Sequence, residues 1–105
     1  MEKQRVESYG IKFTINEGEL EVARTFLYVM NNGLHEEPFG LMEDVFVKEG
    51  FRERGYGEQL VRELIAEARQ TGCYKLICTS RTPWVQDWYV RLGFEQRGLE
   101  LRMDL

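Results

Sequence analysis

The stretch that decides the fold is Arg52–Leu60, RERGYGEQL, because the pattern of the chain changes there. Before it, Leu41–Val47 reads LMEDVFV, an apolar run of the length and composition of a buried strand. After it, apolar residues recur three and four positions apart, as they do on one face of a helix. The stretch is therefore a strand-to-helix junction. The first turn of such a helix carries unpaired N–H groups and a partial positive charge.

Two glycines and two arginines give this junction its chemistry. Gly55 and Gly57 lack the Cβ atoms that would hinder close approach, and Arg52 and Arg54 add cationic donors. Together with the helix N-terminus they predict a phosphate or pyrophosphate site. An ordinary glycine loop with exposed arginines is the alternative on these residues alone. A Walker A loop needs lysine where Glu58 stands, and a dinucleotide-binding loop needs a third glycine that is absent.

The rest of the chain predicts the order β-β-β-α-β-α-β in a single domain over residues 1–105. Strands are expected at Gly10–Ile15, Leu20–Met30, Phe39–Val47 and Tyr74–Cys78, with one or two closing strands in Phe94–Leu105. One helix is expected to stop at Gly72, and a second to cover Pro83–Arg91 with Thr82 as its N-cap. The first three strands form an antiparallel meander. The strand–helix–strand crossover predicts a parallel central pair, so the fold class is a compact mixed α/β sheet.

Composition narrows the function classes. With 43% hydrophobic and 30% charged residues over 105 positions, we expect a globular domain. A net charge of -4 without a basic block argues against nucleic-acid binding. No apolar run is long enough for a membrane span, and the opening residues lack an apolar signal region, so we expect a cytoplasmic protein. Cys73 and Cys78 are expected to be reduced structural thiols, and a single histidine predicts no metal site.

Two segments resemble the signatures of one family. VKEGFRERGYG (Val47–Gly57) resembles the acetyl-CoA pyrophosphate loop of the GNAT acetyltransferases, Arg/Gln-x-x-Gly-x-Gly/Ala. DWYVRLGFE (Asp87–Glu95) resembles the family's second signature, aromatic-Tyr-x-Lys/Arg-x-Gly-Phe. The resemblance implies acetyl-CoA as cosubstrate and an amine acceptor. It places the cofactor contacts at Val45, Phe46, Val47, Arg52, Glu53, Arg54, Gly55, Tyr56, Gly57 and Glu58.

A closer resemblance concerns one branch of that family. MEDVFV and GCYKLI are similar to segments of the glucosamine 6-phosphate N-acetyltransferases, and GLELRM to their C-terminal strand. Those enzymes exchange that strand between subunits, so the resemblance implies a homodimer. The chain departs from them in running directly from the first predicted strand into the second, where they have helices. The asparagine that many relatives place before Tyr89 is also absent.

Three side chains are candidates for the chemistry of acetyl transfer. No Ser-His-Asp or Cys-His set is evident, so direct attack by the amine is expected. By resemblance, the phenol of Tyr89 is the acid for the departing thiolate, with a core tyrosine as the alternative. Glu43 and Asp44 interrupt an apolar strand, and either is a candidate base, directly or through water. One of them should face packed material unless a bulge re-aims it; the alternative is a strand end with both carboxylates solvated.

The remaining aromatic and imidazole side chains carry no predicted role in catalysis. Trp84 and Trp88 are expected to pack, and His35 to lie on the surface. The sequence thus favours an acetyl-CoA-dependent N-acetyltransferase. The alternative is a CoA-binding module without turnover, acting as a regulatory or scaffold subunit.

Overall fold

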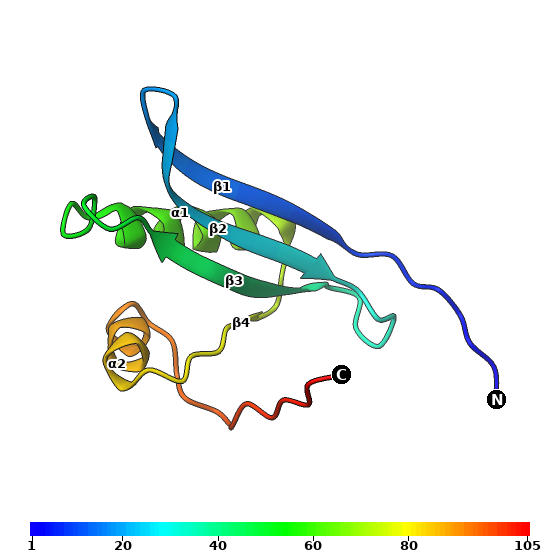
Figure 1. The fold of residues 1–105 in the computed structure, drawn as a ribbon. Helices are drawn as coiled ribbons and strands as arrows, with labels where there is room; N and C mark the ends of the chain where they lie inside the picture. Colours follow the sequence, from blue (N-terminus) through cyan, green and yellow to red (C-terminus); the bar gives the residue numbers. More distant parts are fainter.

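A computed structural model describes all residues 1–105, and its elements follow the predicted order through the second helix (Figure 1). The strands and helices are β1 Tyr9–Glu17, β2 Leu20–Met30, β3 Phe39–Val47, α1 Tyr56–Thr71, β4 Leu76–Ile77 and α2 Pro83–Arg91. None of the helices is both long and apolar enough to cross a bilayer.

The four strands form one mixed sheet in the order β1-β2-β3-β4. β1 pairs with β2 and β2 with β3 in antiparallel fashion, whereas β3 and β4 are parallel. The parallel pair is short, joining Gly40 to Leu76 and Leu41 to Ile77. The predicted meander and parallel central pair are both confirmed.

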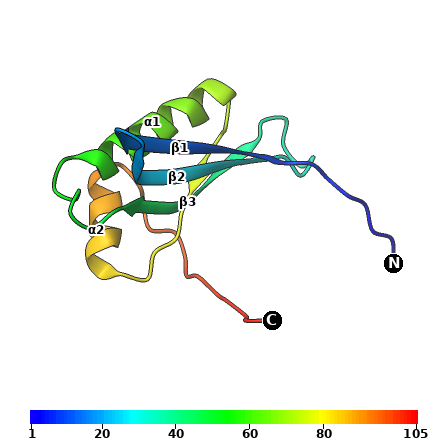
Figure 2. The ribbon, with the colours of Figure 1, turned by 45° about the horizontal axis from the view of Figure 1, so that its top comes forward.

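The core lies between the sheet and α1, which packs against β1, β2 and β3. Apolar side chains alternate along β2 and recur at helical spacing on α1, so one face of each is buried. α2 lies past the edge of β3 and beside the start of α1 (Figure 2), and it contributes Tyr89 to the same core. The core residues are Leu27, Val29, Met42, Val61, Leu64, Ala68 and Tyr89.

Both helices end or begin at the predicted capping residues. Gly72 adopts a left-handed conformation with φ 87°, and its backbone N–H donates to the carbonyls of Ala68 and Arg69 in the last turn of α1. The glycine is needed because an L side chain strains that backbone region. Thr82 is the extended N-cap of α2, with Pro83 in the first turn. Its hydroxyl does not cap the helix; the nearby carbonyl of Ser80 instead accepts a bond from the Gln86 amide at 2.6 Å.

Two strand predictions are corrected. β4 covers only Leu76–Ile77 rather than Tyr74–Cys78, because β3 turns away from it beyond Leu41. The closing strand does not form: residues 95–105 are exposed and have no regular structure. A strand needs a neighbour for its backbone hydrogen bonds, and within a single chain this segment reaches none.

Candidate functional site

The loop Gly50–Gly57, called the glycine loop below, has the backbone expected of an anion cradle. Gly50 (φ 92°), Glu53 (φ 63°) and Gly55 (φ 80°) all lie in the left-handed region, so the chain turns sharply before α1. Gly55 is the N-cap of α1, and no side chain caps the helix. The N–H groups of the first turn are therefore left to an outside acceptor.

The two arginines of the glycine loop differ in their partners. Arg52 donates from Nε to the Val47 carbonyl at 3.0 Å, which ties the loop to the end of β3 and leaves its terminal N–H groups exposed. Arg54 is held by Glu17 of β1 at 2.9 Å and lies over the Phe51 ring at 5.0 Å. The Tyr56 hydroxyl also donates to Glu17, at 3.2 Å. Arg54 is thus held by contacts to Glu17 and Phe51, whereas Arg52 keeps its terminal N–H groups free.

The two motif glycines serve different purposes. A Cβ at Gly55 would meet nothing within 4 Å, so this position is open on its outer side. A Cβ at Gly57 would lie 3.4 Å from the Trp88 ring and 3.7 Å from Val47. A Cβ at Gly57 would thus make ordinary contacts and a larger side chain would press on Trp88, so this position faces packed side chains rather than the open side of the loop.

β3 and β4 separate beyond their two paired residues, and we call this region the splay. Past Leu41, β3 has no strand partner on its β4 side. The backbone groups of Val45–Val47 that face this side are consequently free of sheet hydrogen bonds. The resemblance places cofactor contacts at Val45–Val47, and contacts to the backbone there need groups that are free in this way.

A bulge in β3 decides where the two candidate bases point. The register passes from Arg24 opposite Phe46 to Phe26 opposite Glu43, so three residues of β3 oppose two of β2. Asp44 has φ 56°, in the left-handed region that glycine adopts most easily and that aspartate adopts more often than most other residues. Both Glu43 and Asp44 are exposed, so neither faces packed material: the bulge re-aims them.

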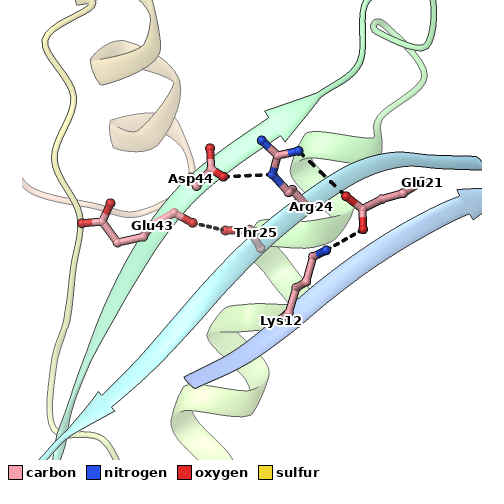
Figure 3. A network of polar contacts seen from close by, with 6 residues as sticks. All are labelled: Lys12, Glu21, Arg24, Thr25, Glu43 and Asp44. Atoms are coloured by element: carbon pink, nitrogen blue, oxygen red, sulfur yellow. Dashed lines mark hydrogen bonds and ion pairs between the residues drawn. The ribbon is translucent and has the colours of Figure 1, made fainter. Parts of the chain in front are cut away.

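The bulge gives the two carboxylates different surroundings. Asp44 is paired with Nε of Arg24 at 2.9 Å, on the outer face of the sheet. Glu43 forms no ion pair, and its side chain points away from Arg24 toward the segment that leads through β4 (Figure 3). Of the two, Glu43 is the one with a free carboxylate at the splay.

Glu43 lies close enough to Cys78 and Tyr89 to influence both, and we call the three the Glu43 cluster. Burial, the Cys78 thiol and the Glu43 carboxylate raise the pKa of Tyr89 to about 12. Burial and the Glu43 carboxylate raise the pKa of Cys78 to about 11. Both groups are therefore protonated at neutral pH. The cluster combines one negative charge with one neutral hydrogen-bond donor, as a base and an acid would require.

Sequence reasoning missed several residues that shape the site. Cys78 was expected to be a structural thiol, and it lies in the Glu43 cluster. Arg24 and Thr25 contact the bulge from β2, and Glu17 holds Arg54. One signal was available: Arg24 is the only charged residue between Glu21 and Met30, inside an otherwise apolar strand.

The remaining predicted side chains lie as follows. His35 is on the surface, with its ring 4.6 Å from that of Tyr74. Trp88 packs as expected, but Trp84 is 70% exposed and does not. Cys73 and Cys78 are both free thiols. Glu58 lies in the first turn of α1 and pairs with Arg62 at 3.4 Å.

Comparison with known proteins gives consistent relatives. Glucosamine 6-phosphate N-acetyltransferase 1 of Oryza sativa subsp. japonica is 40% identical over 62 residues, which cover 59% of this chain and 37% of that protein. Glucosamine 6-phosphate N-acetyltransferase of Trypanosoma brucei brucei is 36% identical over 66 residues, covering 63% of this chain and 44% of that protein. The chain thus matches less than half the length of these relatives.

A solved structure and a family profile extend the match beyond these segments. The crystal structure of a Trypanosoma brucei acetyltransferase superimposes with a TM-score of 0.85 and 26% identity, over 91% of this chain and 69% of that one. The acetyltransferase (GNAT) family profile matches residues 7–94, which include the splay, the glycine loop and the Glu43 cluster. The chain therefore belongs to the GNAT family of acetyltransferases.

Proposed function

We propose that this chain binds acetyl-CoA at the glycine loop and transfers the acetyl group to an amine by direct attack. The observation that carries the proposal is that three features follow one another in space. They are the Glu43 cluster, the free strand edge at Val45–Val47, and the uncapped start of α1. The helix start suits a pyrophosphate, and a free strand edge suits the amide groups of an extended pantetheine arm.

The charge of each side chain decides whether it accepts or donates a proton in this reaction. The cosubstrate supplies the acetyl thioester, whose carbonyl carbon the amine attacks. Glu43 forms no ion pair, so its carboxylate is available to accept the proton that the amine loses, directly or through water. Tyr89 is neutral and donates its hydroxyl proton in a hydrogen bond to the sulfur as the C–S bond breaks.

Glu43 and Tyr89 are coupled in this scheme. A phenol with a pKa of about 12 gives up its proton reluctantly to a thiolate whose thiol has a pKa of ~8.5. The Glu43 charge is one cause of that raised pKa. Once Glu43 takes the amine proton its charge disappears, so the phenol becomes a better acid at the moment when the thiolate needs a proton.

Removing one charged donor from the glycine loop tests the binding step. Arg52→Ala should weaken acetyl-CoA affinity on the order of tenfold to a hundredfold, because a charge-assisted hydrogen bond contributes about 1.5–3 kcal/mol. Calorimetry measures the affinity, and Arg62→Ala on the outer face of α1 is the matched control. Unchanged affinity in Arg52→Ala contradicts the assignment of the loop.

Turnover is tested with a panel of acceptors. Glucosamine 6-phosphate comes first, because it stands in the names of the relatives, followed by other amino sugars, amines and peptides. Thiol release after mixing with acetyl-CoA reports transfer. The second candidate function, a CoA-binding module without turnover, is favoured by the direct β1–β2 hairpin, because the chain has no helices where the glucosamine 6-phosphate N-acetyltransferases that it resembles have them. Acetyl-CoA binding with no thiol release across the panel supports that candidate.

A homodimer built partly from residues 99–105 is also part of the proposal. Leu99, Leu101 and Met103 alternate with charged residues and are 87%, 92% and 81% exposed in the single chain. An exposed segment with this alternating pattern can add as a strand to the sheet edge of another subunit. Sedimentation of a chain truncated after Gly98 should show monomers or aggregates, and a well-behaved dimer from that truncation contradicts the proposal.

A further inference from the structure

The bulge at Glu43–Asp44 is an irregular conformation that contacts with neighbouring residues must stabilise. It places a non-glycine residue at φ 56° and leaves three residues of β3 opposite two of β2. A regular strand would avoid both the backbone strain and the lost pairing. Without the bulge, the pairing of β3 with β2 would shift by one residue, so every following side chain of β3 would move to the other face of the sheet.

Two contacts from neighbouring residues of β2 meet the bulge. The Thr25 hydroxyl donates to the Glu43 carbonyl at 3.1 Å, and Arg24 Nε donates to the Asp44 carboxylate at 2.9 Å (Figure 3). Adjacent strand residues point to opposite faces. Thr25 is fully buried and Arg24 lies on the outer face, so the bulge is contacted from both faces of the sheet.

Arg24 is itself held in place. Glu21 lies 3.8 Å from its guanidinium, and Lys12 of β1 pairs with Glu21 at 2.7 Å. The guanidinium also lies over the Phe46 ring, 4.5 Å from its centroid. A single exposed ion pair stabilises little. The direct contacts of Arg24 with Glu21 and with the Phe46 ring together fix the direction of the arginine, and that direction is what Asp44 requires.

We propose that Arg24 and Thr25 are positioning residues that hold the Glu43–Asp44 bulge in its productive form. In that form the Glu43 side chain faces the splay, and the Val45–Val47 edge lies open beside it. This inference rests on the proposed function for its catalytic meaning. The alternative is that both contacts add only to the stability of the sheet.

The two readings differ in what they predict for the folded protein. If the contacts hold the bulge, losing one lowers the fraction of folded molecules that can bind, and the apparent dissociation constant rises by the same factor. If they only stabilise the sheet, the melting temperature falls while the affinity of the folded protein stays constant. Affinity measured well below the melting temperature therefore separates the two.

Four variants make the test. Thr25→Val removes the hydroxyl with little change in shape, and Thr25→Ser keeps it. Arg24→Gln removes the pair on the surface and does not depend on core packing. Lys12→Gln is the matched control, because it removes one positive charge nearby and leaves every direct contact of Arg24 in place.

Calorimetry with acetyl-CoA should show affinity about three- to tenfold weaker for Thr25→Val and Arg24→Gln, the effect of one lost hydrogen bond. Thr25→Ser and Lys12→Gln should stay within about twofold. Glycine adopts the left-handed conformation freely, so Arg24→Gln should cost no further affinity when added to Asp44→Gly. Affinity within about twofold of wild type in both Thr25→Val and Arg24→Gln overturns the proposal.

A second measurement separates this inference from the proposed function. Backbone NMR shifts of Asp44 in the free protein report its left-handed conformation without any ligand. They should change in Arg24→Gln and persist in Lys12→Gln, and persistence in both variants overturns the inference. If the wild-type protein binds no acetyl-CoA, the proposed function fails while these shifts still decide whether Arg24 holds the bulge.

Discussion

The glycine loop and the Glu43 cluster lie at the two ends of one strand segment, yet they are built in different ways. The glycine loop is contiguous, and its shape comes from left-handed residues such as Gly50 and Gly55 and from the start of α1. The Glu43 cluster takes one residue each from β3, from the segment after β4 and from α2. A binding loop can be set by local backbone geometry, whereas this cluster depends on how the sheet separates and where α2 packs.

The sharpest way to separate the two regions is a change that affects chemistry without binding. Tyr89→Phe keeps the ring, which packs 5.5 Å from Phe94 and 5.2 Å from Trp88, and removes only the hydroxyl. Turnover should fall by about 10² to 10⁴, the usual range for a general acid. Acetyl-CoA affinity should stay within a few-fold, the reverse of the pattern expected for Arg52→Ala.

The leaving group provides the control for that substitution. An acyl thioester of a more acidic thiol needs less help from an acid, so the loss in Tyr89→Phe should be smaller with it. If Tyr89→Phe turns over an active acceptor as fast as wild type, the tyrosine is a core residue and water protonates the sulfur. The assignment of the glycine loop survives that result.

The same contrast explains what the sequence could predict. The strands, both helices and the caps at Gly72 and Thr82 follow from periodicity and local backbone preferences, and they were predicted to within a few residues. The two motifs also lie in contiguous segments. The prediction of a closing strand was wrong. A strand forms only beside a partner edge, and the sequence of Phe94–Leu105 does not specify one.

The details of the site were harder to predict because they depend on contacts between distant segments. The sequence suggested a bulge only as one possibility, since the bulge involves the pairing of β3 with β2 and contacts to Arg24 and Thr25, which lie far away in the sequence. The engagement of Arg54 by Glu17 joins residues 37 positions apart. The packing of Trp88 on Gly57 likewise depends on how α2 docks beside α1.

A substitution at Gly57 should have an effect of intermediate size. In the structure this glycine faces the side chains of Trp88 and Val47 rather than the open side of the loop. Gly57→Val would push a branched side chain against Trp88, and overpacking of this kind costs about 1–3 kcal/mol. We expect a lower melting temperature and altered tryptophan fluorescence. Gly55→Val is the comparison: it strains a residue at φ 80° in open space, so the fluorescence should remain unchanged. Weaker acetyl-CoA binding by Gly57→Val at full stability contradicts the packing role.

The smallest expected effect tests the geometry of the Glu43 cluster without any ligand. The Glu43 charge is the second cause, after burial, of the raised pKa of Cys78, about 11 against an ordinary 9.0. Glu43→Gln should therefore lower that pKa while leaving it above the ordinary value. Since the thiolate is the reactive form, alkylation of Cys78 at pH 8 should become faster by about two- to tenfold.

Two controls accompany this experiment within the same chain. The pKa of Cys73 is raised by burial alone, so its alkylation rate, resolved by peptide mapping, should not change in Glu43→Gln. Asp44→Asn removes the neighbouring charge, which points to Arg24, and should leave Cys78 unaffected. Equal rates for Cys78 in Glu43→Gln and wild type would place the carboxylate away from the splay and remove it as the base.

The same charge has a consequence for stability at alkaline pH, and its sign can be worked out. The folded protein holds the protons of Cys78 and Tyr89 more tightly than the unfolded chain, because both pKa values are raised, to about 11 and about 12. The unfolded state then binds fewer protons above pH 9, so the free energy of unfolding falls as the pH rises from about 9 to 12. Glu43→Gln removes part of both shifts and should make that fall shallower, as urea unfolding at pH 8 and pH 10 would measure. A fall of equal steepness in Glu43→Gln and wild type would mean that the Glu43 charge raises neither pKa value.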